Sequence, residues 1–364
     1  MEKNKDQQTS ETFLVKNHFP SIIISQFFGY FPLSITSNGT ENPRLNLKVS
    51  VTSVFAFLLL FAHVLWIVSL TNSEFMEESF NNQGATGYII MLAWGYNILV
   101  PLIIIIRGQK FVKVKRFLCF WRNFFIFNTN LCSVLSKPVL TTYFSCMYRK
   151  KCYDYCRVIS LALLICIHIS ANIALCFVFY FQLPISMKLI TIIWDSTTLI
   201  HACNSCLMLS MMRTFAIALN ALSAELEMCA KNSVCLFTKC QTVDFKPFNE
   251  QAKLKMVLNL FKQLENCIKE FCMVYSWEIF IDVIYSALEI LVTIFMAFTT
   301  FKYFSTIYNF IVCGCFLVFY CEVLWHLCHQ GSKITESAYE FIHQLENIPG
   351  NLMDKETKYL VSKY

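Results

Sequence analysis

The sequence predicts an all-α protein, a polytopic membrane helix bundle with six spans, on the basis of three observations. The composition is 56% hydrophobic and only 15% charged, whereas soluble domains carry about a quarter of charged residues. Six apolar stretches are each long enough to cross a bilayer, which takes about 20 residues. Basic residues are also unequally shared between alternate connections, as they are on the two sides of a membrane.

Going along the chain, the apolar stretches separate polar connections and two amphipathic segments. The predicted spans are Val49–Leu70, Thr86–Ile106, Val158–Leu183, Leu189–Met212, Phe271–Phe298 and Tyr303–Leu327. The regions are an N-terminal segment (1–48), spans one to four (49–217) with a basic connection (107–157), a loop and amphipathic helix (218–270), spans five and six (271–327), and a C-terminal segment (328–364). The shorter run FLCFWRNFFIF at 117–127 contains an arginine, and we expect it to form a helix in the membrane interface.

Basic residues predict the orientation of the bundle. The connection from Arg107 to Arg157 holds 11 Lys or Arg and one acid, Asp154, and residues 220–270 hold seven Lys. The other three connections hold at most one basic residue each. We therefore expect a multi-pass plasma-membrane protein with a cytoplasmic N-terminus. None of the 18 cysteines falls in the predicted outer loops, so we expect reduced thiols.

Two amphipathic helices are predicted outside the membrane. In the first, which runs into span five without a breaker, apolar residues recur at three and four positions. These residues are Leu254, Val257, Leu258, Phe261, Leu264 and Ile268. The second has Ile334, Ala338, Phe341, Ile342 and Leu345, and Pro349-Gly350 ends it. The two apolar faces either pack on each other or form a subunit interface. Residues 229–250 lack a helical period and predict a loop.

Span five carries an acidic stripe. Glu278, Asp282 and Glu289 are spaced so that one helical face holds all three, with Tyr285 between them. A charged carboxylate near the bilayer centre costs about 2.5–3.5 kcal/mol, so we expect this face to lie inside the bundle. Glu278 and Asp282, with Leu258 and Phe261 before them, are the candidate gating and coupling residues.

Polar and aromatic residues of the other spans predict a ligand pocket that opens to the outside. On the predicted topology most of them lie in the outer half or near mid-depth, where a ligand reaches them. The candidate ligand-binding residues are Glu289, Tyr285, Asp195, His201, Asn172, Tyr96, Asn97, Trp94, Tyr308 and Asn309. The alternative is that each forms an interhelical hydrogen bond, worth about 0.6 kcal/mol.

Enzymatic, nucleic-acid and metal functions find no support. The sequence has no phosphate-binding glycine loop, no HExxH and no GxSxG. A net charge of +6 is too small to indicate nucleic-acid binding. The pair Cys203 and Cys206 and the run Trp325–His329 do not supply four well-placed metal ligands, so we expect neither a metal nor a cofactor.

Several short motifs resemble one known family. Phe27-Phe28-Gly29-Tyr30-Phe31-Pro32 stands just before span one as an apolar–Gly–x–x–Pro signature. Cys328, Glu336 and Leu345 follow span six in a Cys…Glu…Leu pattern. Together with the cytoplasmic N-terminus and the long helix before span five, these motifs resemble the insect gustatory receptors of the insect chemoreceptor superfamily.

The resemblance implies a taste receptor subunit: a ligand-gated, nonselective cation channel that assembles as a homo- or hetero-tetramer. It implies a small-molecule tastant, a sugar or a bitter compound, and contact with membrane lipid. Carboxylates suit sugar hydroxyls, and equally suit cationic compounds beside aromatic rings. The family ends in a seventh, pore-lining span, whereas this sequence stops at KETKYLVSKY. We therefore expect the chain as written to lack the pore helix and not to conduct by itself.

Two other functions stay open. A secondary transporter would use Asp282 and Glu289 to couple protons or sodium, but it predicts internal repeats that the sequence lacks. A G-protein-coupled receptor requires an outside N-terminus, against the distribution of basic residues.

Overall fold

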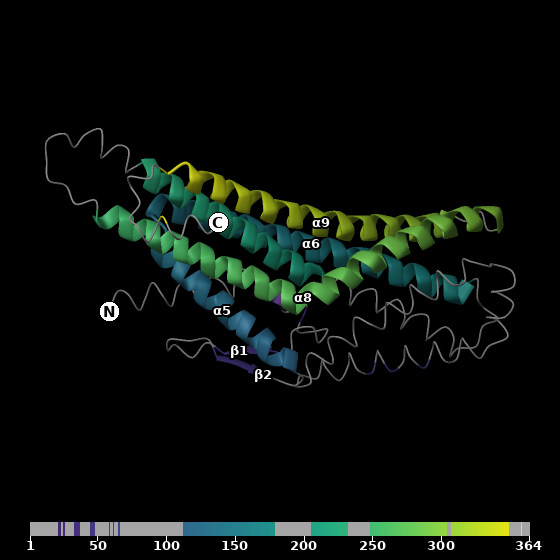
Figure 1. Ribbon diagram of the computed structural model, residues 1–364. Coiled ribbons are helices and arrows are strands. Elements are labelled where there is room, and N and C mark those ends of the chain that lie inside the picture. Colours follow the sequence, from purple (N-terminus) through teal and green to yellow (C-terminus); the bar gives the residue numbers. More distant parts are fainter. Residues whose placement is uncertain are drawn as a thin grey trace.

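The computed structural model describes five long helices that lie along one another in an elongated bundle (Figure 1). They are α5 (Val112–Val134), α6 (Lys137–Val178), the helix Ser205–Lys231, α8 (Phe248–Tyr303) and α9 (Ile307–Glu346). The residues described are 33–36, 44–47, 112–178, 205–231, 248–303 and 307–348, with Ser21, Ile22, Ser25, Leu58, Phe61, Leu65 and Lys358. Predicted spans one and two lie outside these residues, apart from three positions in span one.

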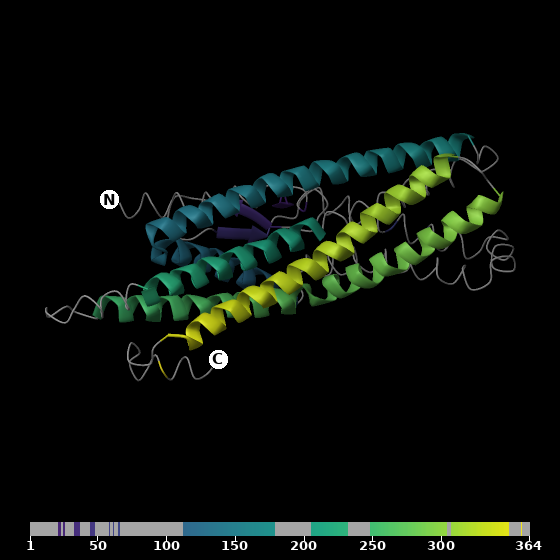
Figure 2. The same cartoon turned by 90° about the horizontal axis from the view of Figure 1, so that it is seen from above.

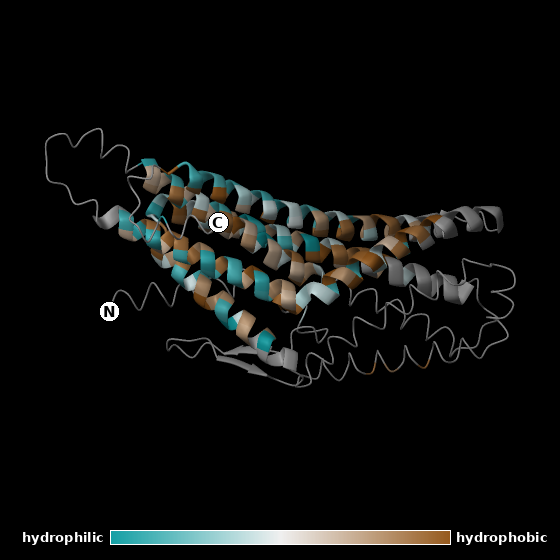
Figure 3. Ribbon diagram, viewed as in Figure 1, coloured by the Kyte–Doolittle hydropathy of each residue, from teal (hydrophilic) through white to brown (hydrophobic). Residues whose placement is uncertain are grey.

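Helices α6, α8 and α9 each have a polar part and an apolar part, and the apolar parts lie toward the same end of the bundle (Figure 3). In α6 the last charged residue is Arg157, and the helix continues to Val178 without another. α8 begins polar and becomes apolar after Glu270, and α9 runs the opposite way, from apolar to polar. One half of the bundle therefore suits hydrocarbon and the other half suits water.

The antiparallel pair α8 and α9 fixes which residues lie at the same level. The rings of Phe261 and Phe341 stack with centroids 4.1 Å apart, and further along Tyr285 meets Tyr320 at 5.5 Å. Trp277 of α8 and Trp325 of α9 fall between these two contacts and therefore lie at about the same level. Figure 1 and Figure 2 show that both helices run along the length of the bundle, and the two helices contact each other.

The two amphipathic segments pack on each other, which is one of the two alternatives that the sequence left open; a subunit interface stays a prediction. Leu254, Val257 and Leu264 of α8 are buried, and so are Phe341 and Leu345 of α9. The first segment continues into predicted span five as one unbroken helix, as expected. α9 is also unbroken and ends at Glu346, three residues before Pro349, because the residue before a proline disfavours helix.

Residues 117–127 form a helix as expected, but the prediction that this helix lies in the membrane interface is wrong. It is part of α5, a 23-residue helix that packs on α8 inside the polar half of the bundle. Its aromatic side chains are almost fully buried: Phe117, Phe120, Trp121, Phe124, Phe125 and Phe127. The run has too many apolar residues to lie half in water, and their burial between helices removes that surface from solvent.

Helices also replace much of the predicted connections. α6 begins at Lys137, well before the predicted start of span three at Val158, so the end of the basic connection is helical. The helix Ser205–Lys231 extends beyond predicted span four and into the predicted loop by three residues. Residues 232–247 of that loop lie outside the described residues.

Two described helices are long and apolar enough to cross a membrane, Ser205–Lys231 and Gln251–Leu291. The first is mostly buried by its neighbours and forms the centre of the described bundle. The all-α prediction misses one small element, an antiparallel pair of strands, β1 (Leu33–Thr36) and β2 (Arg44–Leu47), in which Leu33 pairs with Leu47. The residues LSIT alternate apolar and polar, which is the period of a strand.

Candidate functional site

The three acids of span five lie inside the bundle. Glu278, Asp282 and Glu289 are 0%, 2% and 8% exposed. The opposite face of α8 is exposed and apolar, with Trp277 at 58% and Leu291 at 59%. The helix therefore turns its carboxylates toward the other helices and its apolar side chains outward, which is the expected interior position.

Tyr285 and Glu289 form a small polar group within an aromatic wall. The Tyr285 and Tyr320 hydroxyls lie 3.1 Å apart, and the Tyr285 hydroxyl also hydrogen-bonds the Glu289 carboxyl one turn further along α8. Tyr320 stacks on Phe316 at 5.9 Å and meets Phe319 edge-on at 5.0 Å. A carboxyl and two hydroxyls surrounded by rings can recognise a hydroxylated or a cationic small molecule.

The remaining predicted site residues divide into three groups. Leu258 and Phe261 are buried at the α8–α9 contact, where Phe261 stacks on Phe341. Asn172 lies in α6, and Tyr308 and Asn309 lie in α9, but their side chains are outside the described set. Trp94, Tyr96, Asn97, Asp195 and His201 lie outside the described residues. The ligand-binding and gating roles of all these residues stay predictions.

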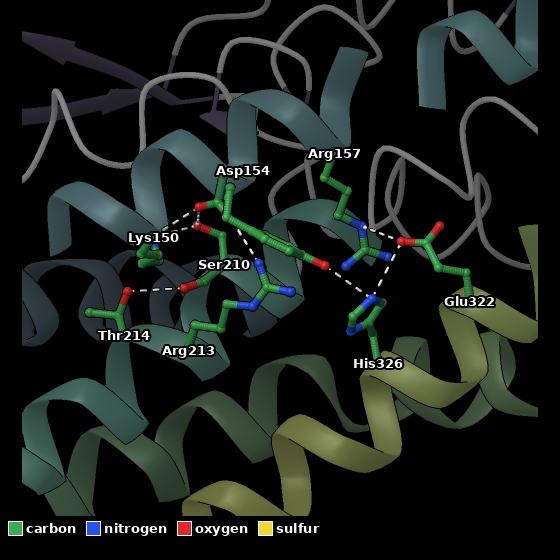
Figure 4. Close-up of polar contacts among 9 residues, drawn as sticks. Lys150, Asp154, Arg157, Ser210, Arg213, Thr214, Glu322 and His326 are labelled. Atoms are coloured by element: carbon green, nitrogen blue, oxygen red, sulfur yellow. Dashed lines mark hydrogen bonds and ion pairs between the residues drawn. The ribbon is translucent and has the colours of Figure 1, made fainter. Parts of the chain in front are cut away.

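A buried ionic cluster joins α6 to the helix Ser205–Lys231, and sequence reasoning missed it (Figure 4). The Asp154 carboxylate lies 3.2 Å from the Lys150 ammonium and 3.2 Å from the Arg213 guanidinium. The Ser210 hydroxyl donates to Asp154 and accepts from Lys150, both at 2.8 Å. Burial lowers the pKa of Lys150, and the neighbouring Asp154 opposes that effect.

A second ionic cluster joins α6 to α9 (Figure 4). Arg157 and His326 approach the Glu322 carboxylate at 3.6 and 3.5 Å. The Tyr153 hydroxyl lies 3.1 Å from His326 Nε2, and the Arg213 guanidinium lies 3.8 Å from the centre of the Tyr153 ring. Tyr153 therefore links the two clusters, and three helices are fastened together at the level where the bundle changes from polar to apolar.

Glu225 forms a third buried contact, deeper in the polar half. The Ser136 backbone N–H and hydroxyl both donate to its carboxylate at 2.8 Å, and Lys253 pairs with it from α8. Ser136 precedes α6, so Glu225 supplies an acceptor to a donor that a helix N-terminus leaves unsatisfied. This contact connects α6, α8 and the helix Ser205–Lys231.

The sequence carried one signal for these clusters. Lys150 and Asp154 stand four residues apart, and Arg157 follows within the next turn, all on the run that leads into an apolar span. That spacing puts opposite charges on one face of a helix. Their partners Ser210, Arg213 and Glu322 come from distant segments, and no spacing rule connects them.

The long helices with an apolar half and buried polar groups define a helical membrane protein. A family model for 7tm chemosensory receptors matches residues 18–364, and the chain therefore belongs to the 7tm chemosensory receptor family. No curated protein sequence matches the chain. Membership makes the protein a membrane chemoreceptor for small-molecule ligands, in a family that is not one of enzymes. It confirms the assignment to the chemoreceptors that the short motifs suggested.

Proposed function

We propose that the chain is a gustatory receptor subunit, part of a ligand-gated, nonselective cation channel that detects a small tastant from outside the cell. The observation that supports this proposal most is the match to the chemosensory receptor family over residues 18–364. The buried group of Tyr285, Glu289 and Tyr320 in the apolar half of the bundle adds a place where a ligand finds polar partners.

The ligand site in this proposal is built around Glu289. Its carboxylate accepts hydrogen bonds from a hydroxylated ligand or pairs with a cationic one. Tyr285 exchanges its hydrogen bond to Tyr320 for one to the ligand, so binding changes a contact between α8 and α9. The predicted residues Asp195, His201, Trp94, Tyr96 and Asn97, with Asn172, Tyr308 and Asn309, complete the pocket.

Coupling in this proposal runs along α8. This helix is continuous from Phe248 to Tyr303, so it joins the group around Tyr285 to the apolar contact of Leu258 and Phe261 with α9. Glu278 and Asp282 lie between these two ends on the buried face. A shift of α8 at the ligand end therefore reaches the polar half of the bundle without crossing a loop.

The proposed orientation places the N-terminus and the polar half of the bundle in the cytoplasm of a plasma-membrane protein. The support is the excess of basic residues in residues 107–157 and 220–270. The tetrameric assembly, as a homomer or with other receptor subunits, rests on the resemblance to gustatory receptors.

The test is a current recording in cells that express the chain with whatever coding sequence its transcript carries. Sugars and cationic bitter compounds are applied from outside. A ligand-evoked cation current that Glu289→Gln changes more than Glu278→Gln supports the proposal. Glu278 is the comparison residue, because it is buried on the same face but lies about three turns nearer the polar half. Uptake without current indicates a transporter, and an equal effect of both substitutions removes Glu289 from the site.

A further inference from the structure

Two exposed thiols lie one helical turn apart on α6. Cys152 and Cys156 are both exposed, and their spacing of four puts them on one face of the helix. Four other described cysteines of the polar half are buried or half-buried: Cys132, Cys146, Cys229 and Cys267. The exposed thiols of the described residues are Cys119, Cys152, Cys156, Cys166, Cys272, Cys321 and Cys328.

The contacts of the same stretch of α6 fix the level of this pair. Tyr153 contacts His326 at 3.1 Å, and Arg157 pairs with Glu322 at 3.6 Å. Cys152 and Cys156 are therefore level with the α9 segment that holds Trp325, which is 67% exposed. Exposed tryptophans concentrate at the boundary between a membrane and water, so the pair lies at that boundary.

The face of α6 that carries the thiols continues as an apolar row into the membrane half. Ile159, Leu163 and Ile167 follow at helical spacing and are about half exposed. An acyl chain attached at Cys156 would extend along these side chains. On the polar side, Arg149 is exposed and Lys151 is half-exposed. These two cations attract an anionic acyl donor or an anionic membrane surface to this part of α6.

We propose that Cys152 and Cys156 are S-acylated with long-chain fatty acids from acyl-coenzyme A. The cysteine thiol loses its proton, and the thiolate attacks the carbonyl carbon of the donor thioester. The bond from that carbon to the coenzyme A sulfur breaks, a new thioester to the cysteine forms, and coenzyme A leaves as a thiol with the proton. The reaction involves no change in oxidation state. Acylation anchors α6 to the bilayer at the level of the ionic clusters. This proposal is independent of the proposed channel function.

The experiment is an acyl exchange on the full chain from insect cells. Free thiols are blocked, thioesters are cleaved with hydroxylamine, and the released thiols are coupled to a polyethylene glycol maleimide that adds a mass step for each site. The expected result is up to two steps that require hydroxylamine. Cys152→Ser and Cys156→Ser each remove one step, and the double variant removes both. Labelling with an alkynyl fatty acid follows the same order.

Two neighbouring thiols of α6 serve as matched controls. Cys146→Ser, on the polar side, and Cys166→Ser, within the apolar half, keep both steps. Serine is close in size to cysteine, and an unchanged gel-filtration profile in detergent shows that the double variant folds. The proposal is overturned if the wild type shows no step while a known acylated protein in the same sample does. It is also overturned if the double variant keeps its steps, since another cysteine then carries the acyl group.

Discussion

Replacing Asp154 by Asn tests the ionic cluster between α6 and the helix Ser205–Lys231. The substitution keeps the size of the side chain but leaves Lys150 and Arg213 without their counter-ion. The Lys150 side chain is 2% exposed and that of Arg213 12%, so water compensates little. Removing one partner of a buried ion pair costs about 3–5 kcal/mol, and this is the loss we expect in the free energy of unfolding.

The assay is pulse proteolysis across a denaturant series in detergent for the wild type, Asp154→Asn, Lys150→Met and the double variant. Lys150→Met should cost less than Asp154→Asn, because Asp154 retains Ser210 and Arg213. The double variant should be more stable than the sum of the single losses predicts, by about 1–3 kcal/mol, because it carries one unpaired cation fewer.

The cluster also gives a pH dependence. The pKa of Lys150 is lowered by burial, and loss of Asp154 lowers it further. Between the folded pKa and the ordinary value of 10.5 the unfolded chain binds one more proton, so stability rises with pH. Asp154→Asn should therefore recover part of its loss as the pH approaches 10.5. Additive single losses, or an Asp154→Asn loss below about 0.5 kcal/mol, would refute this reasoning.

Three further predictions concern packing and ionisation. Phe261→Ala should lower the free energy of unfolding by about 3–5 kcal/mol, because Phe261 is buried against Phe341. Met256 is exposed, so Met256→Ala should change it by no more than about 0.5 kcal/mol. Equal losses in pulse proteolysis would contradict the stacking. Tyr285→Phe should cost about 1–3 kcal/mol, since it loses the hydrogen bonds to Tyr320 and to the buried Glu289 carboxyl but keeps the ring contact. A loss as large as that of Tyr285→Ala would mean that the hydroxyl contributes most of the contact. Burial raises the pKa of Cys132 from 9.0 to about 11, so the thiol ionises first in the unfolded chain, and stability falls as the pH rises through this range. Cys132→Ala should reduce this fall when the free energy of unfolding is measured across a pH series. An unchanged slope would mean that other groups cause the fall.

The parts of the fold that sequence predicts best are those that a helical period fixes. The apolar spacing from Leu254 to Ile268 predicts both the helix and its buried face, and the continuity into span five follows from the absence of a breaker. The spacing of the acids of span five puts them on one face, and the cost of exposing charge to lipid predicts that this face is buried, as it is.

The parts that sequence does not predict depend on contacts between distant segments. The run 117–127 is rich in aromatic residues, and a sequence alone does not distinguish a helix that lies on lipid from one buried between helices. The partners of Asp154 are Ser210 and Arg213, which lie more than fifty residues away in the sequence. Their pairing therefore depends on how the helices pack. The strands at 33–36 and 44–47 are too short for a period of two to stand out.

The measurement that most directly tests the account is a ligand-evoked current from the chain, expressed with whatever coding sequence its transcript carries, after α8 is weakened between the Tyr285 group and the contact of Leu258 and Phe261 with α9. Lys262→Gly with Asn266→Gly changes two exposed positions one turn apart and leaves the buried face intact. Each glycine weakens a helix by about 0.5–1 kcal/mol. The matched control, Thr335→Gly with Tyr339→Gly, alters exposed positions of α9 at the same spacing. Coupling along α8 predicts that the first pair reduces the current with ligand binding unchanged and that the second pair does so less. Equal currents in both variants and the wild type would contradict it.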